Sequence, residues 1–120
     1  MDEEWVSFSE LNDGRFYNQA FQSYTGDLLA THTNSIIERK DFFVSAFQAE
    51  AIEMGDLSFQ LKVLPKVSLS LVLWLGDEDF PPSCKILFNR SVNSFLPTDV
   101  CAIVGSMFTH RILKIVNEKV

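Results

Sequence analysis

The hydrophobic positions first recur at intervals of three and four residues, which is the period of one helix face. Between residues 17 and 28 this spacing predicts a helix with an apolar stripe of Tyr17, Phe21, Tyr24 and Leu28. The polar segment Thr31–Ser35 indicates a connection. Helical spacing then returns and predicts a second helix from Lys40 to about Met54, ended by Gly55.

After Gly55 the period of the pattern shortens to two residues. Residues 58–63 alternate between polar and apolar, which predicts a strand with one solvent-exposed face. Beyond Pro65 and Lys66, residues 67–75 alternate again, and so short a link favours an antiparallel pair. "CKILF" at Cys84–Phe88 predicts a third strand, and "WVSF" at Trp5–Phe8 suits another.

The last part of the chain predicts a helix that begins at Thr98 or Asp99. Its apolar stripe consists of Val100, Ile103, Val104, Met107, Phe108, Ile112 and Ile115. Asp99 near the start and the basic residues near the end complement the helix dipole (His110, Arg111 and Lys114).

The order of these elements is a strand, two helices, three strands and a helix. Hairpin strands with helices gathered elsewhere indicate an α+β fold: an antiparallel sheet of three to four strands covered on one face by about three helices. The length of 120 residues suits a single domain, residues 1–120, and the 47% of hydrophobic residues supplies its core.

Charge and composition narrow the classes of function. The net charge is −6 and the ten Lys and Arg residues are scattered, which disfavours nucleic acid and anionic membranes as partners. The acidic start "MDEEW" is unlike a signal peptide, and the apolar run at residues 69–75 is too short to span a bilayer. We therefore expect a soluble, cytoplasmic protein. Cys84 and Cys101 lack a metal-ligand spacing and are expected to be core residues, and no cofactor is predicted.

The octapeptide "GDEDFPPS" at Gly76–Ser83 is the candidate for chemistry. Its carboxylates, Asp77, Glu78 and Asp79, could be a structural turn, a partner or ligand surface, or a metal or catalytic site. In a structural turn, Asp77 bonds backbone amides and Phe80 returns to cover the core. In the second case, Trp74 and Phe80 join the carboxylates in one contact surface. For a metal, Asp77 and Asp79 are the ligand candidates.

Three stretches together resemble a bacterial and archaeal family, the domain of unknown function DUF3786. They are "WVSFSEL" at Trp5–Leu11, "LPKVSLSLVLWLGDEDFPPSCKILF" at Leu64–Phe88 and "FLPTDVCAIVGSMFTHRIL" at Phe95–Leu113. Longer members carry more chain before the tryptophan, so the chain resembles the C-terminal portion of the family. If sheet strands lie in that further part, we expect an edge covered by self-association, hence a homodimer.

The resemblance also implies a context for function. Members are often fused or adjacent to a four-cysteine iron–sulfur domain in anaerobes that use corrinoid chemistry. Two thiols cannot hold such a cluster, which needs four ligands. We therefore predict a non-catalytic binding or interaction domain with a protein partner, accessory to iron–sulfur or corrinoid methyl-transfer proteins. The alternative is a small metal-dependent enzyme or ligand-binding protein that uses Asp77, Glu78 and Asp79.

Overall fold

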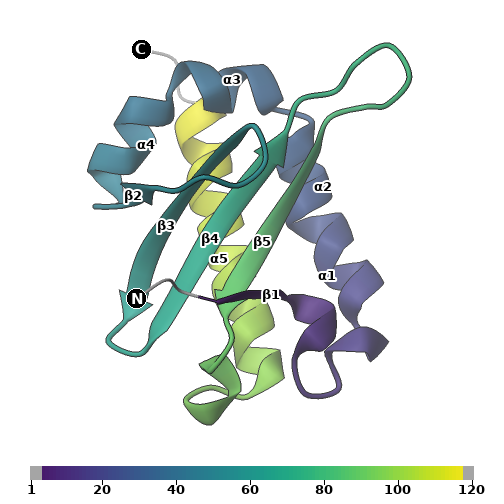
Figure 1. Cartoon of the computed structure of the whole chain (residues 1–120), viewed down its shortest axis with the longest axis vertical. Coiled ribbons are helices and arrows are strands. Elements are labelled where there is room, and N and C mark those ends of the chain that lie inside the picture. Colours follow the sequence, from purple (N-terminus) through teal and green to yellow (C-terminus); the bar gives the residue numbers. More distant parts are fainter. Residues whose placement is uncertain (1–3, 118–120) are drawn as a thin grey trace.

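A computed structural model describes residues 4–117, so the acidic Met1–Glu3 segment lies outside the described residues. Five strands form one antiparallel sheet in the order β1-β5-β4-β3-β2 (Figure 1). Their bounds are β1 Trp5–Ser7, β2 Glu50–Ala51, β3 Leu57–Leu64, β4 Val67–Trp74 and β5 Ser83–Asn89. The α+β class and the β3–β4 hairpin are confirmed, whereas the predicted number of three to four strands is too low.

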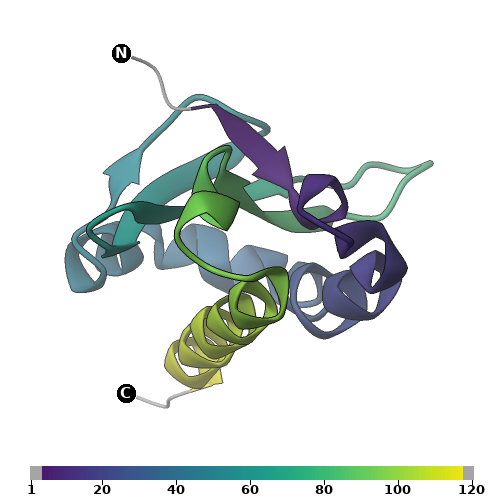
Figure 2. The same cartoon turned by 90° about the horizontal axis from the view of Figure 1, so that it is seen from below.

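The helices gather on one face of the sheet, as the view from below shows (Figure 2). Short 3-10 turns lie at Phe8–Glu10 (η1), Gly14–Phe16 (η2) and Val92–Ser94 (η3). The α-helices are α1 Asn18–Tyr24, α2 Gly26–Ala30, α3 Thr33–Glu38, α4 Lys40–Ala46 and α5 Thr98–Asn117. Behind the sheet, α5 lies between α4 and the α1–α2 pair (Figure 1).

The core lies between the sheet and this helix layer. Alternate residues of β3, β4 and β5 point toward the helices, and Phe59, Leu71 and Phe88 are fully buried among them. Aromatic rings join the two layers: the ring centroid of Phe21 on α1 lies 6.0 Å from that of Phe88 on β5, and that of Phe43 on α4 lies 6.4 Å from that of Phe59 on β3. The period-two pattern of the strands therefore selects the face that the helices cover.

The segment Thr31–Ser35, predicted as a connection, runs into helix α3. Ile36 is fully buried and anchors this helix, while the Thr33 hydroxyl donates to the Ala30 carbonyl. The prediction was wrong because burial of Ile36, with Ile37 packed against the edge of the core, holds a short helix whose remaining side chains are polar.

Helix α4 ends at Ala46, well before the predicted end at Met54. Gln48 has a left-handed backbone (φ 52°), and the chain then forms β2, in which Ala51 pairs with Phe59. Gly55, predicted as the helix stop, instead lies over the sheet near Val72 with φ 56°. Pairing with β3 thus overrides the helical spacing of this segment.

Helix α5 forms where it was predicted, but only part of its apolar stripe is buried. The side that meets the core carries Cys101, Gly105, Phe108, Thr109 and Ile112. A Cβ at position 105 would lie 2.7 Å from the Phe21 ring, so this glycine admits the ring and sets the helix rotation. Ile103 and Met107 consequently remain 57% and 62% exposed. Cys84 and Cys101 are both buried, as predicted.

Candidate functional site

The predicted loop joins β4 to β5 and projects beyond the end of the sheet (Figure 1). Asp77 holds its turn: its Oδ1 accepts the N–H groups of Asp79 and Phe80, each at 2.8 Å, and its own N–H donates to the Phe80 carbonyl at 2.8 Å. This is the amide bonding predicted for a structural turn.

The side chains of this loop point outward. Residues 74–83 are all exposed, and Phe80 keeps 70% of its surface accessible. The prediction that Phe80 covers the core is therefore wrong. Leu75 is 52% exposed, and Trp74 lies against Gly55 with 37% of its surface free. The loop thus presents two exposed apolar side chains, Leu75 and Phe80, beside Glu78 and Asp79.

The carboxylates of the loop do not converge on a common point with further ligands. Asp77 Oδ1 is already engaged by two amides. Within residues 4–117 there is no group of three or more His, Cys, Asp or Glu side chains that could hold a metal ion.

A groove of about 620 Å³ separates the loop from the segment that links α2 to α3. His32 and its neighbours form one wall, and Leu75, Asp77 and Phe80 belong to the other. The sequence indicated the loop but not this second wall, because the two segments are more than 40 residues apart in the chain.

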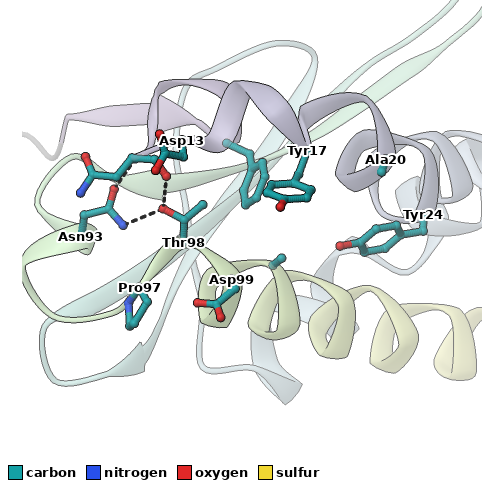
Figure 3. A pocket seen from close by; sticks show the side chains of 11 residues that line it. Asp13, Tyr17, Ala20, Tyr24, Asn93, Pro97, Thr98 and Asp99 are labelled. Carbon is teal, nitrogen blue, oxygen red and sulfur yellow. Dashed lines mark hydrogen bonds between the residues drawn. The ribbon is translucent and has the colours of Figure 1, made fainter.

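A second hollow, of about 640 Å³, lies between η2–α1 and the start of α5 (Figure 3). Phe8, Tyr17 and Tyr24 contribute aromatic rings to it, and Ala20 and Ala102 contribute small apolar surfaces. The hydroxyl groups of Tyr17 and Tyr24 both face the hollow (Figure 3). We call this hollow the tyrosine cleft.

Hydrogen bonds fix one end of the tyrosine cleft. Asn93 Oδ1 accepts the Asn12 N–H at 2.8 Å, and Asn93 Nδ2 donates to Thr98 Oγ1 at 3.2 Å. The Thr98 hydroxyl donates to the Asn12 carbonyl at 2.7 Å (Figure 3). These bonds join the turn before η2 to the first residue of α5, so the two walls of the cleft are held together.

The charged side chains that line the tyrosine cleft are acidic. Asp13 and Asp99 line it, and within the described chain no Lys, Arg or His side chain does. The faces of tyrosine rings are themselves electron-rich. Two carboxylates and two such rings around an apolar floor favour a cationic occupant.

The family model for the domain of unknown function DUF3786 matches residues 1–111. The chain belongs to this family. The match includes the β4–β5 loop, both walls of the tyrosine cleft and most of α5. No curated protein and no solved structure matches this DUF3786 chain. In the part of the chain that the structure describes, no helix is long and apolar enough to cross a membrane.

Neither thiol of the DUF3786 chain is poised as a nucleophile. Burial, reinforced by the nearby Asp27 carboxylate, raises the pKa of the Cys84 thiol to about 12. Burial and Asp99 raise the pKa of Cys101 to about 11. Because the thiolate is the reactive form, both side chains act as small core residues at neutral pH.

The sequence pattern did not predict that the residues of the tyrosine cleft form a site. Tyr17 and Tyr24 were assigned to a helix face whose only buried member is Phe21. The helix is interrupted at Thr25, so Leu29 is buried in α2 while Leu28 stays 40% exposed. The signal available in the sequence was the turn-forming run Asn12-Asp13-Gly14, in which Asp13 adopts a left-handed conformation with φ 60°.

Proposed function

We propose that this DUF3786 domain is a non-catalytic interaction domain that binds a protein partner through its β4–β5 loop. The observation that supports this function is Phe80, which is 70% exposed in a turn held by three hydrogen bonds of Asp77. A large aromatic side chain in a pre-ordered loop loses little entropy when it enters a partner's pocket.

The partner that fits this loop has an apolar pocket with a basic rim. Phe80 would fill the pocket, and Leu75 and Trp74 would extend the apolar contact. Glu78 and Asp79 are exposed beside them and complement positive charge on the partner, which favours encounter and register.

The family resemblance supplies the context of the proposal. We place the domain in the cytoplasm of an anaerobe, as an accessory to iron–sulfur or corrinoid methyl-transfer proteins. Two unpaired, buried cysteines suit a reducing compartment. The alternative, a metal-dependent enzyme centred on the loop, gains no specific support, because Asp77 already serves the turn.

The decisive variant is Phe80→Ala, with Phe16→Ala as its matched control. Phe16 is an equally exposed phenylalanine, 68% accessible, on a different element. The partner is captured from the source cell, identified by mass spectrometry and purified, and its affinity is measured by calorimetry. Phe80→Ala should weaken binding roughly 30-fold, as expected when a central aromatic anchor is truncated, and Phe16→Ala should not. Equal affinities for the two variants would refute the role of the loop.

The tyrosine cleft favours a second function, the binding of a small organic cation. Its volume of about 640 Å³ lies within the range of small-molecule sites. A ligand with an apolar body would cover Phe8 and Ala102, and its ammonium or guanidinium group would meet Asp99 and the ring of Tyr17.

Benzylamine and benzyl alcohol test this second function, because they share a ring and differ in charge. In an NMR titration, benzylamine should bind about tenfold more tightly and shift the amide signals around Tyr17 and Asp99. The double variant Asp13→Asn/Asp99→Asn should remove that preference, while Asp79→Asn in the loop should leave it intact. Equal affinity of the two probes for the wild-type domain would exclude a cation site.

A further inference from the structure

The two ends of the tyrosine cleft differ in chemistry. Asp13 and Asp99 both lie at the end where α5 begins, because the hydrogen bond from the Thr98 hydroxyl to the Asn12 carbonyl holds the turn before η2 against the first residue of α5. Tyr24, the last residue of α1, lies at the opposite end, and its hydroxyl points back along the cleft (Figure 3). One end is therefore anionic, and the other offers a neutral hydrogen-bonding group.

The packing of α1 on α5 sets the separation of these two ends. An added Cβ on Gly105 would lie 2.7 Å from the ring of Phe21, so α1 meets α5 at this point. Gly105 is six residues beyond Asp99, or about 9 Å along the helix. Tyr24 follows Phe21 by less than one turn, and its ring extends back toward the start of α5 (Figure 3). A ligand that joins the two ends therefore needs a chain of several carbon atoms.

The ring of Tyr24 is held in place, whereas that of Tyr17 lies at the rim. Tyr24 packs edge-on against the buried Phe21, with ring centroids 5.9 Å apart, and Phe21 stacks on Phe8 at 4.3 Å. Tyr17 is 65% exposed, against 38% for Tyr24. None of the described residues that line the cleft hydrogen-bonds to the Tyr24 hydroxyl (Figure 3). A hydroxyl that is already positioned loses little freedom when a ligand binds to it.

Small apolar side chains line the cleft between its two ends. Ala20 of α1 and Ala102 of α5 contribute methyl groups there, and the buried ring of Phe8 belongs to the same lining. Among the described residues, the lining near Tyr24 has neither a carboxylate to pair with a second ammonium group nor a basic side chain to pair with a carboxylate. The middle of the cleft therefore suits a hydrocarbon chain, and the Tyr24 end suits a polar group without charge.

We propose that the ligand of the tyrosine cleft is a monoamine whose far end carries a neutral hydroxyl or amide group. Its ammonium group lies between Asp99 and the ring of Tyr17, and its far group bonds to the Tyr24 hydroxyl. Tyr24 is thus the residue that selects among amines. The inference rests on the second function proposed above, the binding of an organic cation, and adds to it a required length and a required group at the other end.

Terminal amino alcohols, from ethanolamine to aminohexanol, test this requirement when each is compared with the n-alkylamine of the same carbon number. The two members of a pair carry the same charge, so the general attraction of an acidic protein for amines cancels. Dissociation constants are measured by NMR titration of the full chain. At one intermediate length the ratio of affinities, alcohol to alkylamine, should be roughly fivefold higher than for ethanolamine, as expected for one additional hydrogen bond.

Tyr24→Phe removes only the hydroxyl and should abolish this rise in the ratio. Tyr17→Phe is the matched control: it makes the same change at the ammonium end and should leave the rise intact. The comparison is a double-mutant cycle between the hydroxyl of the ligand and that of Tyr24, so it measures their coupling apart from any general effect of the substitution.

Two results would overturn the proposal, and they differ in what else they exclude. If alkylamines bind more tightly than n-alkanols but Tyr24→Phe leaves the ratio unchanged at every length, the cation site stands and the role of Tyr24 is refuted. If alkylamines bind no more tightly than n-alkanols, the cation site itself fails, and this inference fails with it.

Discussion

Phe88→Ala is expected to lower the free energy of unfolding by about 4 kcal/mol. Phe88 has no exposed surface and lies near the centre of the core, on strand β5. Its ring lies 6.0 Å from that of Phe21 and 6.4 Å from that of Phe8, which places it between the sheet and the first helices. Truncation would remove the contacts of a whole ring and leave a cavity that the paired strands on either side cannot close.

Urea and thermal unfolding followed by circular dichroism measure this loss. A change of about 4 kcal/mol corresponds to a fall of roughly 15 °C in the midpoint for a domain of this size. Phe80→Ala is the control: the same substitution at a 70% exposed position should change stability by less than about 0.5 kcal/mol. A loss below about 1 kcal/mol for Phe88→Ala would mean that the ring is not packed as described.

Gly26→Ala is the second substitution with a large expected effect, about 3 kcal/mol of lost stability. Gly26 begins α2 where that helix meets β5, and an added methyl group would overlap the backbone carbonyl of Cys84. A backbone oxygen inside a paired strand cannot move aside, so α2 would have to shift away from the sheet. Elsewhere in a helix the same substitution would be favourable by up to about 1 kcal/mol.

Gln22 provides the means to separate the backbone clash from a side-chain clash. Its Nε2 donates to the same Cys84 carbonyl at 2.9 Å and would also meet the new methyl group. The double variant Gln22→Ala/Gly26→Ala should be no more stable than Gly26→Ala alone, as measured by urea unfolding. Full recovery of stability in the double variant would show that the loss came from a clash with the Gln22 side chain. It would contradict the close packing of α2 against the β5 backbone.

Much of the secondary structure could be predicted because its patterns were local. The alternation of polar and apolar residues in β3 and β4 is visible in consecutive residues, as is the short link that makes the two strands a hairpin. Asp99 and the basic residues near the end of α5 likewise indicated its direction and extent. The exceptions were β2 and α3, where pairing with Phe59 and burial of Ile36 decided the outcome against the local pattern.

Of the two candidate sites, the β4–β5 loop could be predicted from neighbouring residues, whereas the tyrosine cleft could not. The bonding of Asp77 followed from the residues next to it, since an aspartate readily bonds amides two and three positions along the chain. The tyrosine cleft did not follow, because Asp13 and Asp99 are separated by most of the chain and meet only when α5 packs beside α1.

The sequence by itself determined the α+β class, the β3–β4 hairpin, the extent of α5, the acidic turn and the DUF3786 family, since each depends on short-range spacing or on residue type. The tertiary structure alone decided the strand order, the outward position of Phe80 and the rotation that leaves Ile103 and Met107 in solvent. The physical reason is that periodicity shows that an apolar face exists, whereas packing decides which part of it is buried. In α5 that decision depends on Gly105, whose missing side chain admits the ring of Phe21.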